Sequence, residues 1–173
     1  MHPAFALTRT RLTETRSEFE AFLQANTERL VPLEENQEAS AAWLRAVSRA
    51  SGIEGVYTGM ENVLREVLNL VDGGVFGKSE SFHAQLLAQA AQKTDQRSEV
   101  IDRELYEKLD ELRSFRHRER TSYRHVLKEE LVNKNLELLK KAFSLFETQI
   151  VTFIEAWERR PTDKDDAKSS HKP

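Results

Sequence analysis

The strongest constraint on the fold is a long apolar stripe near the end of the chain. Its members are spaced mostly three or four residues apart: Leu131, Leu136, Leu139, Ala142, Phe143, Phe146, Ile150, Phe153, Ile154 and Trp157. Side chains at this spacing share one face of an α-helix. A helix that is apolar along one whole face must bury it against other elements. The stripe therefore predicts helix-on-helix packing.

The composition favours an all-α chain. Its 173 residues include only six Gly and four Pro, whereas strong helix formers are abundant. Similar spacing earlier in the chain predicts helices near residues 4–30, 34–71, 82–92 and 100–123. Asp72 followed by two glycines predicts the end of the second helix. We therefore expect a four- or five-helix bundle.

The helices predict one domain followed by a polar tail. Residues 1–36 would supply an N-terminal helix and a connection, and that helix would pack with the bundle formed by residues 37–158. Residues 159–173 contain no aliphatic side chain larger than alanine, which predicts a disordered tail. Residues 93–99 are polar, and we expect a mobile loop there.

Three glycines interrupt the second predicted helix: Gly52, Gly55 and Gly59. Glycine costs about 1 kcal/mol relative to alanine inside a helix, so such a series needs a reason. Close approach of a neighbouring helix is one explanation, and a break or kink near Gly52 is the other.

Several classes of function are disfavoured by what the sequence lacks. The absence of cysteine excludes disulfides and thiolate chemistry and fits a cytoplasmic protein. The net charge of −3 gives no overall attraction to nucleic acid or membrane, and no segment predicts a signal peptide or a membrane span. The histidines lack metal-ligand spacing, and no phosphate-binding glycine loop occurs. We therefore predict no metal, no cofactor and no membrane partner.

Residues 109–125 combine an apolar helix face with a basic cluster. The apolar face continues in register into polar side chains: Arg116, Arg120 and Tyr123. A charge directed at a core is costly unless a partner or a polar cleft compensates it. Arg116 could therefore form a buried ion pair, for example with Glu61, or line a polar groove. A third interpretation is an arginine-rich helix end in water.

Arginine combined with histidine or tyrosine suits metal-independent RNA cleavage. The 2′-hydroxyl must lose a proton, the leaving oxygen must gain one, and the phosphorane needs a positive partner. Arginine binds phosphate in a bidentate manner, and histidine carries protons near neutral pH. The cluster would bind RNA through four further side chains: Arg113, Arg120, Arg124 and His125.

Four pieces of the sequence resemble the HepT-like domain of the HEPN superfamily. They are Tyr-Thr-Gly-Met-Glu at 57–61, Asp-Gly-Gly at 72–74, Phe-His-x-x-Leu-Leu at 82–87 and Leu-Arg-Ser-Phe-Arg-His-x-x-Arg-x-x-Tyr at 112–123. The resemblance implies a helical bundle, usually a homodimer. It also implies a ribonuclease toxin whose partner is a nucleotidyltransferase-type antitoxin.

The resemblance also implies roles for particular residues. The family motif is an arginine, a polar residue, a histidine five positions after the arginine, and a tyrosine two beyond. On this pattern Arg116, His117 and Tyr123 are the catalytic candidates, and Tyr123 is where a partner could attach a nucleotide. Glu61 and Tyr57, four residues apart on one helix face, would support the arginine.

One position departs from the family motif, because Thr121 stands where the histidine is expected. His117 could replace it, although its side chain points about 100° away from Arg116 around a helix. Arg120 and His125 form a second pair with the same spacing, in a different register.

The sequence is compatible with three functions. The first is an RNA-cleaving toxin, the second is a degenerate HEPN-like module that binds RNA, nucleotide or a partner protein, and the third is a dimeric helical adaptor. His83 lies at a predicted helix start, and we expect it to make a helix-end hydrogen bond.

Overall fold

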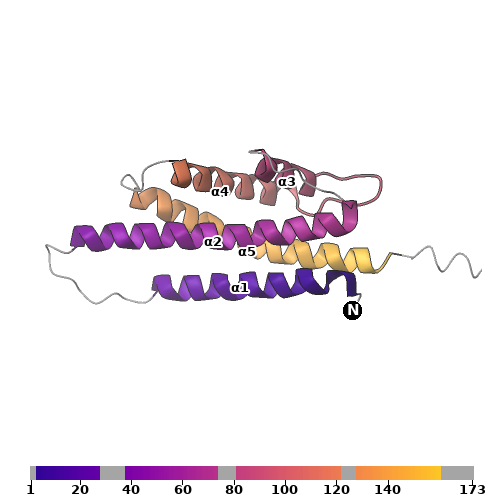
Figure 1. The fold of residues 1–173 in the computed structure, drawn as a ribbon, viewed down its shortest axis with the longest axis horizontal. Helices are drawn as coiled ribbons and strands as arrows, with labels where there is room; N and C mark the ends of the chain where they lie inside the picture. Colours follow the sequence, from indigo (N-terminus) through magenta and orange to yellow (C-terminus); the bar gives the residue numbers. More distant parts are fainter. Residues whose placement is uncertain (1–2, 28–37, 74–80, 122–127, 161–173) are drawn as a thin grey trace, which may run out of the picture.

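The computed structural model describes residues 3–27, 38–73, 81–121 and 128–160. Its elements are, in chain order, η1 (Pro3–Phe5), α1 (Ala6–Thr27), α2 (Glu38–Asp72), α3 (Phe82–Ala90), α4 (Arg103–Thr121) and α5 (Glu129–Glu158). No strand occurs within these ranges. The predicted all-α bundle is confirmed (Figure 1). The predicted connection and most of the predicted tail lie outside the described residues.

Helix α2 is the central element of the bundle. It contacts α1, α3, α4 and α5, and Figure 1 shows it between α1 on one side and the layer of α3 and α4 on the other. The largest fully buried side chains come from η1, α2, α3, α4, α5 and the segment before α4: Phe5, Ile53, Tyr57, Met60, Leu64, Leu68, Leu86, Leu87, Ile101, Phe115, Phe143 and Phe146. One continuous core therefore joins the helices.

The three glycines of α2 let α1 approach closely. A Cβ atom at Gly59 would lie 2.7 Å from Cγ2 of Thr15, and one at Gly55 would lie 2.6 Å from Oε1 of Glu18. A Cβ atom at Gly52 would overlap the ring of Phe22, also on α1. The helix continues through all three positions, so close approach is confirmed and a break near Gly52 is wrong.

The end of α2 tests a further prediction, and the start of α3 shows how that helix is bounded. Gly73 has a φ of +60°, a conformation that costs glycine little, so the predicted glycine stop is confirmed. Ser81 precedes α3 but its side chain makes no capping hydrogen bond. Its hydroxyl instead accepts a hydrogen bond from Nε2 of Gln85 at 2.9 Å.

The segment between α3 and α4 differs from the mobile loop expected at residues 93–99. Arg97 lies within it, and its side chain is 0% exposed. Its guanidinium donates to both carboxylate oxygens of Asp72, at 2.6 and 2.9 Å. It also donates to three main-chain carbonyls: Gln89, Gln92 and Ser98. The loop is therefore fixed to the end of α2 by one buried side chain.

Helix α1 also makes direct contacts with α5. Arg9 forms an ion pair of 3.0 Å with Glu158, and Arg16 pairs with Glu147. The ring of Phe19 stacks on that of Phe143 at a centroid distance of 4.2 Å. The first and last helices are therefore joined directly. No helix in the described ranges is long and apolar enough to cross a membrane.

Candidate functional site

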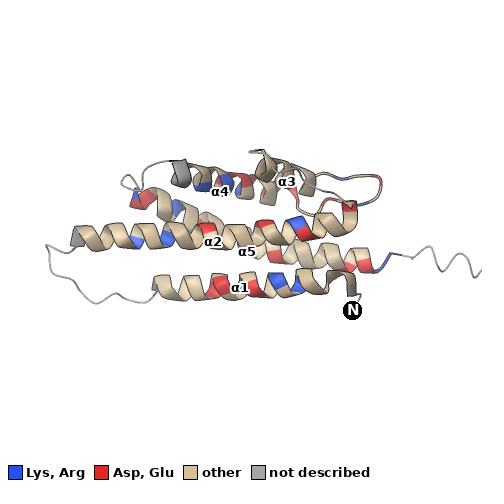
Figure 2. Cartoon of the chain, viewed as in Figure 1, with Lys and Arg blue, Asp and Glu red and all other residues tan. Residues whose placement is uncertain are grey.

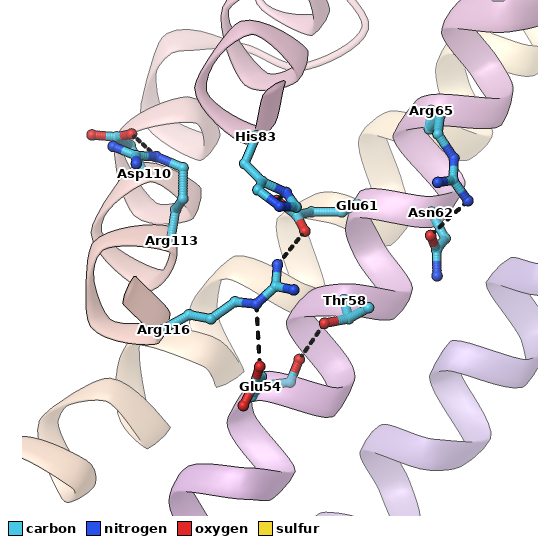
Figure 3. Close-up of polar contacts among 9 residues, drawn as sticks. All are labelled: Glu54, Thr58, Glu61, Asn62, Arg65, His83, Asp110, Arg113 and Arg116. Carbon is cyan, nitrogen blue, oxygen red and sulfur yellow. Dashed lines mark hydrogen bonds and ion pairs between the residues drawn. The ribbon is translucent and has the colours of Figure 1, made fainter. Parts of the chain in front are cut away.

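Arg116 lies where the buried face of α4 ends. The preceding members of this face are buried in the core: Leu105, Leu109, Leu112 and Phe115. The Arg116 side chain, 11% exposed, extends to α2, where Nη1 donates to Oε2 of Glu61 at 2.7 Å. Its Nε donates to Oε1 of Glu54 at 3.3 Å (Figure 3). The structure thus contains the buried ion pair that was one interpretation of Arg116.

The two carboxylates are placed together by the helical repeat of α2. Glu54 and Glu61 are seven residues apart, so they share one face about two turns from each other. Glu61 is only 5% exposed, and a buried charge requires a partner. Arg116 supplies that partner, and the pair fixes the end of α4 against the middle of α2.

Tyr57 lies beneath the guanidinium. Cζ of Arg116 is 5.9 Å from the centre of its ring, a cation–π distance. Burial is the main cause that raises the pKa of Tyr57 above its ordinary value, and the charge of Glu61 adds to it. The hydroxyl therefore stays protonated near neutral pH. It is buried beside the carboxylate of Glu61.

His83 belongs to this cluster, which the sequence did not predict. Its Nδ1 lies 2.9 Å from Oε1 of Glu61, the carboxylate oxygen that Arg116 does not use. In the described ranges His83 thus contacts a side chain of α2, in contrast to the helix-end hydrogen bond that we expected. The His83 side chain is 40% exposed, in contrast to its partner. The only sequence signal for it was its place in the Phe-His-x-x-Leu-Leu segment.

The structure describes only some of the other residues predicted for the site. Nε of Arg113 donates to Oδ1 of Asp110 at 2.8 Å, and this hydrogen bond raises the pKa of Arg113. His117 is exposed. The side chains of Arg120 and Thr121 are not described. Three further candidates lie outside the described residues: Tyr123, Arg124 and His125.

The site contains charges of both signs. Figure 2 shows acidic and basic residues along α4, and acidic residues on the facing part of α2. In the ranges that the structure describes, no three His, Asp or Glu side chains cluster so that they could hold a metal ion. The cluster thus combines one guanidinium with two carboxylates and an imidazole.

These features define a helical-bundle protein with a buried arginine, two carboxylates and a histidine at the junction of α2, α3 and α4. A family model described as HepT-like protein matches residues 48–157, more than half of the chain, and the chain belongs to this family. The predicted resemblance is thereby confirmed. The match includes the whole cluster and leaves α1 outside. No curated protein and no solved structure matches the chain significantly.

Proposed function

We propose that this HepT-like protein cleaves RNA without a metal ion, as the toxin component of a cytoplasmic toxin–antitoxin or defence pair. Family membership supports the pairing with an antitoxin of the nucleotidyltransferase type. The apolar faces and the resemblance support a homodimer, in which two clusters would face a shared cleft.

The observation that carries the proposal is the anchoring of Arg116 at the rim of the core. Nε and Nη1 contact carboxylates, and a guanidinium has five N–H donors. The contact with Glu54 is the longer one, and Glu54 is partly exposed. A phosphate can therefore replace Glu54 while Glu61 keeps the guanidinium in place. A preorganised cation is effective where negative charge develops on the phosphorane.

Other residues complete the proposed site on the family pattern. His117 follows Arg116 and would transfer a proton to the leaving oxygen. Arg113, Arg120, Arg124 and His125 would bind the RNA backbone. Tyr123 would close the groove and accept a nucleotide from the partner enzyme.

A second candidate function is RNA or nucleotide binding without turnover. Two observations favour it: Thr121 replaces the family histidine, and two carboxylates offset the charge of Arg116. A protein of this kind would bind RNA with a steep salt dependence and leave it intact. Thr121→His would then be expected to introduce cleavage. A helical adaptor, in contrast, would show no affinity for RNA even at low salt.

The decisive test is cleavage of total RNA in the presence of a chelator. The parent is compared with Arg116→Ala and with Arg103→Ala, which removes an exposed arginine from the same helix. We expect cleavage by the parent and by Arg103→Ala, and a loss of about 10²–10³-fold in Arg116→Ala, as when one transition-state donor is removed. Equal cleavage by parent and Arg116→Ala would refute the proposal.

A further inference from the structure

We infer that His83 is the general base of this site and that Glu61 orients it. The inference rests on the proposed RNA cleavage and assigns the proton acceptor that the family motif lacks at Thr121. His83 lies on α3, 33 positions before Arg116, so no spacing rule on α4 could identify it.

The hydrogen bond to Glu61 determines which nitrogen of His83 can accept a proton. A carboxylate only accepts hydrogen bonds, so Nδ1, 2.9 Å from Oε1, carries the hydrogen in the neutral ring. Nε2 then keeps its lone pair. This arrangement of acceptor nitrogen, imidazole and carboxylate is the one that orients histidine bases in hydrolases.

One carboxylate places the histidine next to the arginine. Oε1 of Glu61 takes His83, and Oε2 takes Nη1 of Arg116 at 2.7 Å. Figure 3 shows both side chains turned toward Glu61 from different helices. A phosphodiester held by Arg116 would therefore have the imidazole as its neighbour. His117 faces about 100° away from Arg116 around α4, which makes it the less direct base.

Glu61 and His83 also differ in burial, as expected for a carboxylate that orients a general base. Glu61 is almost fully covered, whereas the His83 side chain is 40% exposed. The carboxylate is thus shielded from solvent and from direct contact with RNA, while the ring remains open to substrate. A purely structural ion pair would gain nothing from this exposure.

In the cleavage reaction that we infer, side chains transfer both protons and no metal ion is needed. Nε2 of His83 takes the proton of the 2′-hydroxyl, and the 2′-oxygen forms a bond to phosphorus. The bond from phosphorus to the 5′-oxygen breaks, and that oxygen keeps the electron pair and takes a proton from His117. The products are a 2′,3′-cyclic phosphate and a 5′-hydroxyl. His83 then releases its proton to water, and His117 recovers one.

The test compares His83→Asn with the parent on total RNA. The asparagine amide can keep the hydrogen bond to Glu61 but cannot accept a proton. We expect cleavage to fall about 10²–10⁴-fold, the usual contribution of a general base. Gln85→Ala, an exposed change on the same helix, serves as the control and should cleave normally.

Chemical rescue separates a base from a structural residue. Imidazole added to His83→Gly should restore cleavage in proportion to its unprotonated form. No rescue, or rescue that follows the imidazolium form, would overturn the assignment. Full activity of His83→Asn together with an inactive Arg116→Ala would overturn it too, and would leave the proposed function standing. A parent that does not cleave RNA would refute both.

Discussion

Two arginines in the described ranges, the buried Arg97 and the largely covered Arg116, differ in how completely their hydrogen-bonding capacity is used. Arg97 is fully covered, and all its donor nitrogens contact Asp72 or main-chain carbonyls. Arg116 lies at the rim and makes side-chain contacts with Glu54 and Glu61, in the part of the chain that the structure describes.

This difference separates an arginine that holds the fold from the arginine that we propose binds phosphate. Arg97 closes a loop onto a helix end and has no donor left. Within the described ranges the carboxylate contacts of Arg116 come from α2, and one of these partners, Glu61, is shared with a partly exposed histidine. A buried arginine is therefore a candidate for function when its donors are not exhausted by the fold.

The largest effect is expected from Arg97→Ala. The substitution leaves the carboxylate of Asp72 without its cation and removes the guanidinium donor from three main-chain carbonyls, which should cost about 3–5 kcal/mol of unfolding free energy. Chemical denaturation would measure it. Arg103→Ala, an exposed arginine, should change stability little. A loss below about 1 kcal/mol for Arg97→Ala would contradict its structural role.

Arg116→Ala should reduce RNA cleavage strongly and lower stability less than Arg97→Ala does. Its cost in stability should be smaller than that of Arg97→Ala, because Glu61 keeps its contact with His83 and Glu54 can turn to solvent. Its loss of RNA cleavage should be about 10²–10³-fold. Denaturation and cleavage measured on the same preparations would test this. Equal destabilisation by both substitutions, with cleavage retained, would erase the distinction between the two arginines.

Gly59→Ala should reduce stability without affecting the site. Gly59 lies about 160° around α2 from Glu61, and a methyl group there would press on the buried Thr15. We expect a loss of about 1–3 kcal/mol, as for other overpacked positions. Ser51→Ala, an exposed neighbour on α2, is the control. Thermal melts and cleavage per folded molecule would distinguish the two helix faces.

The smallest effect concerns acid stability. The hydrogen bond from Arg97 holds the pKa of Asp72 below its ordinary value. A carboxyl of this kind stabilises the fold above its unfolded pKa of about 3.9, and this contribution disappears as pH falls through the lower folded value. Stability of the parent should therefore fall below about pH 4 more steeply than that of Asp72→Asn. Parallel pH profiles would contradict this.

The fold was largely predictable because periodic apolar residues report local structure directly. The stop at Gly73 followed from the sequence pattern, and the pairing of Arg116 with Glu61 was one of the interpretations that this pattern left open. Neither the burial of Arg97 nor the contact of His83 with Glu61 could be predicted in this way. Each of these contacts joins two different elements through polar side chains, which follow no apolar periodicity. The sequence of a polar segment is the same whether its arginine is exposed to solvent or buried. The catalytic roles assigned to α4 remain predictions.

The contacts between α1 and α5 have a consequence for how the chain folds during synthesis. Arg9 and Glu158 are 149 positions apart, so the first helix leaves the ribosome long before its ion-pair partner exists. Before α5 exists, α1 can dock along α2, where the glycines admit it. Contacts of such long sequence separation slow folding. The bundle is therefore completed only when its last helix has been made.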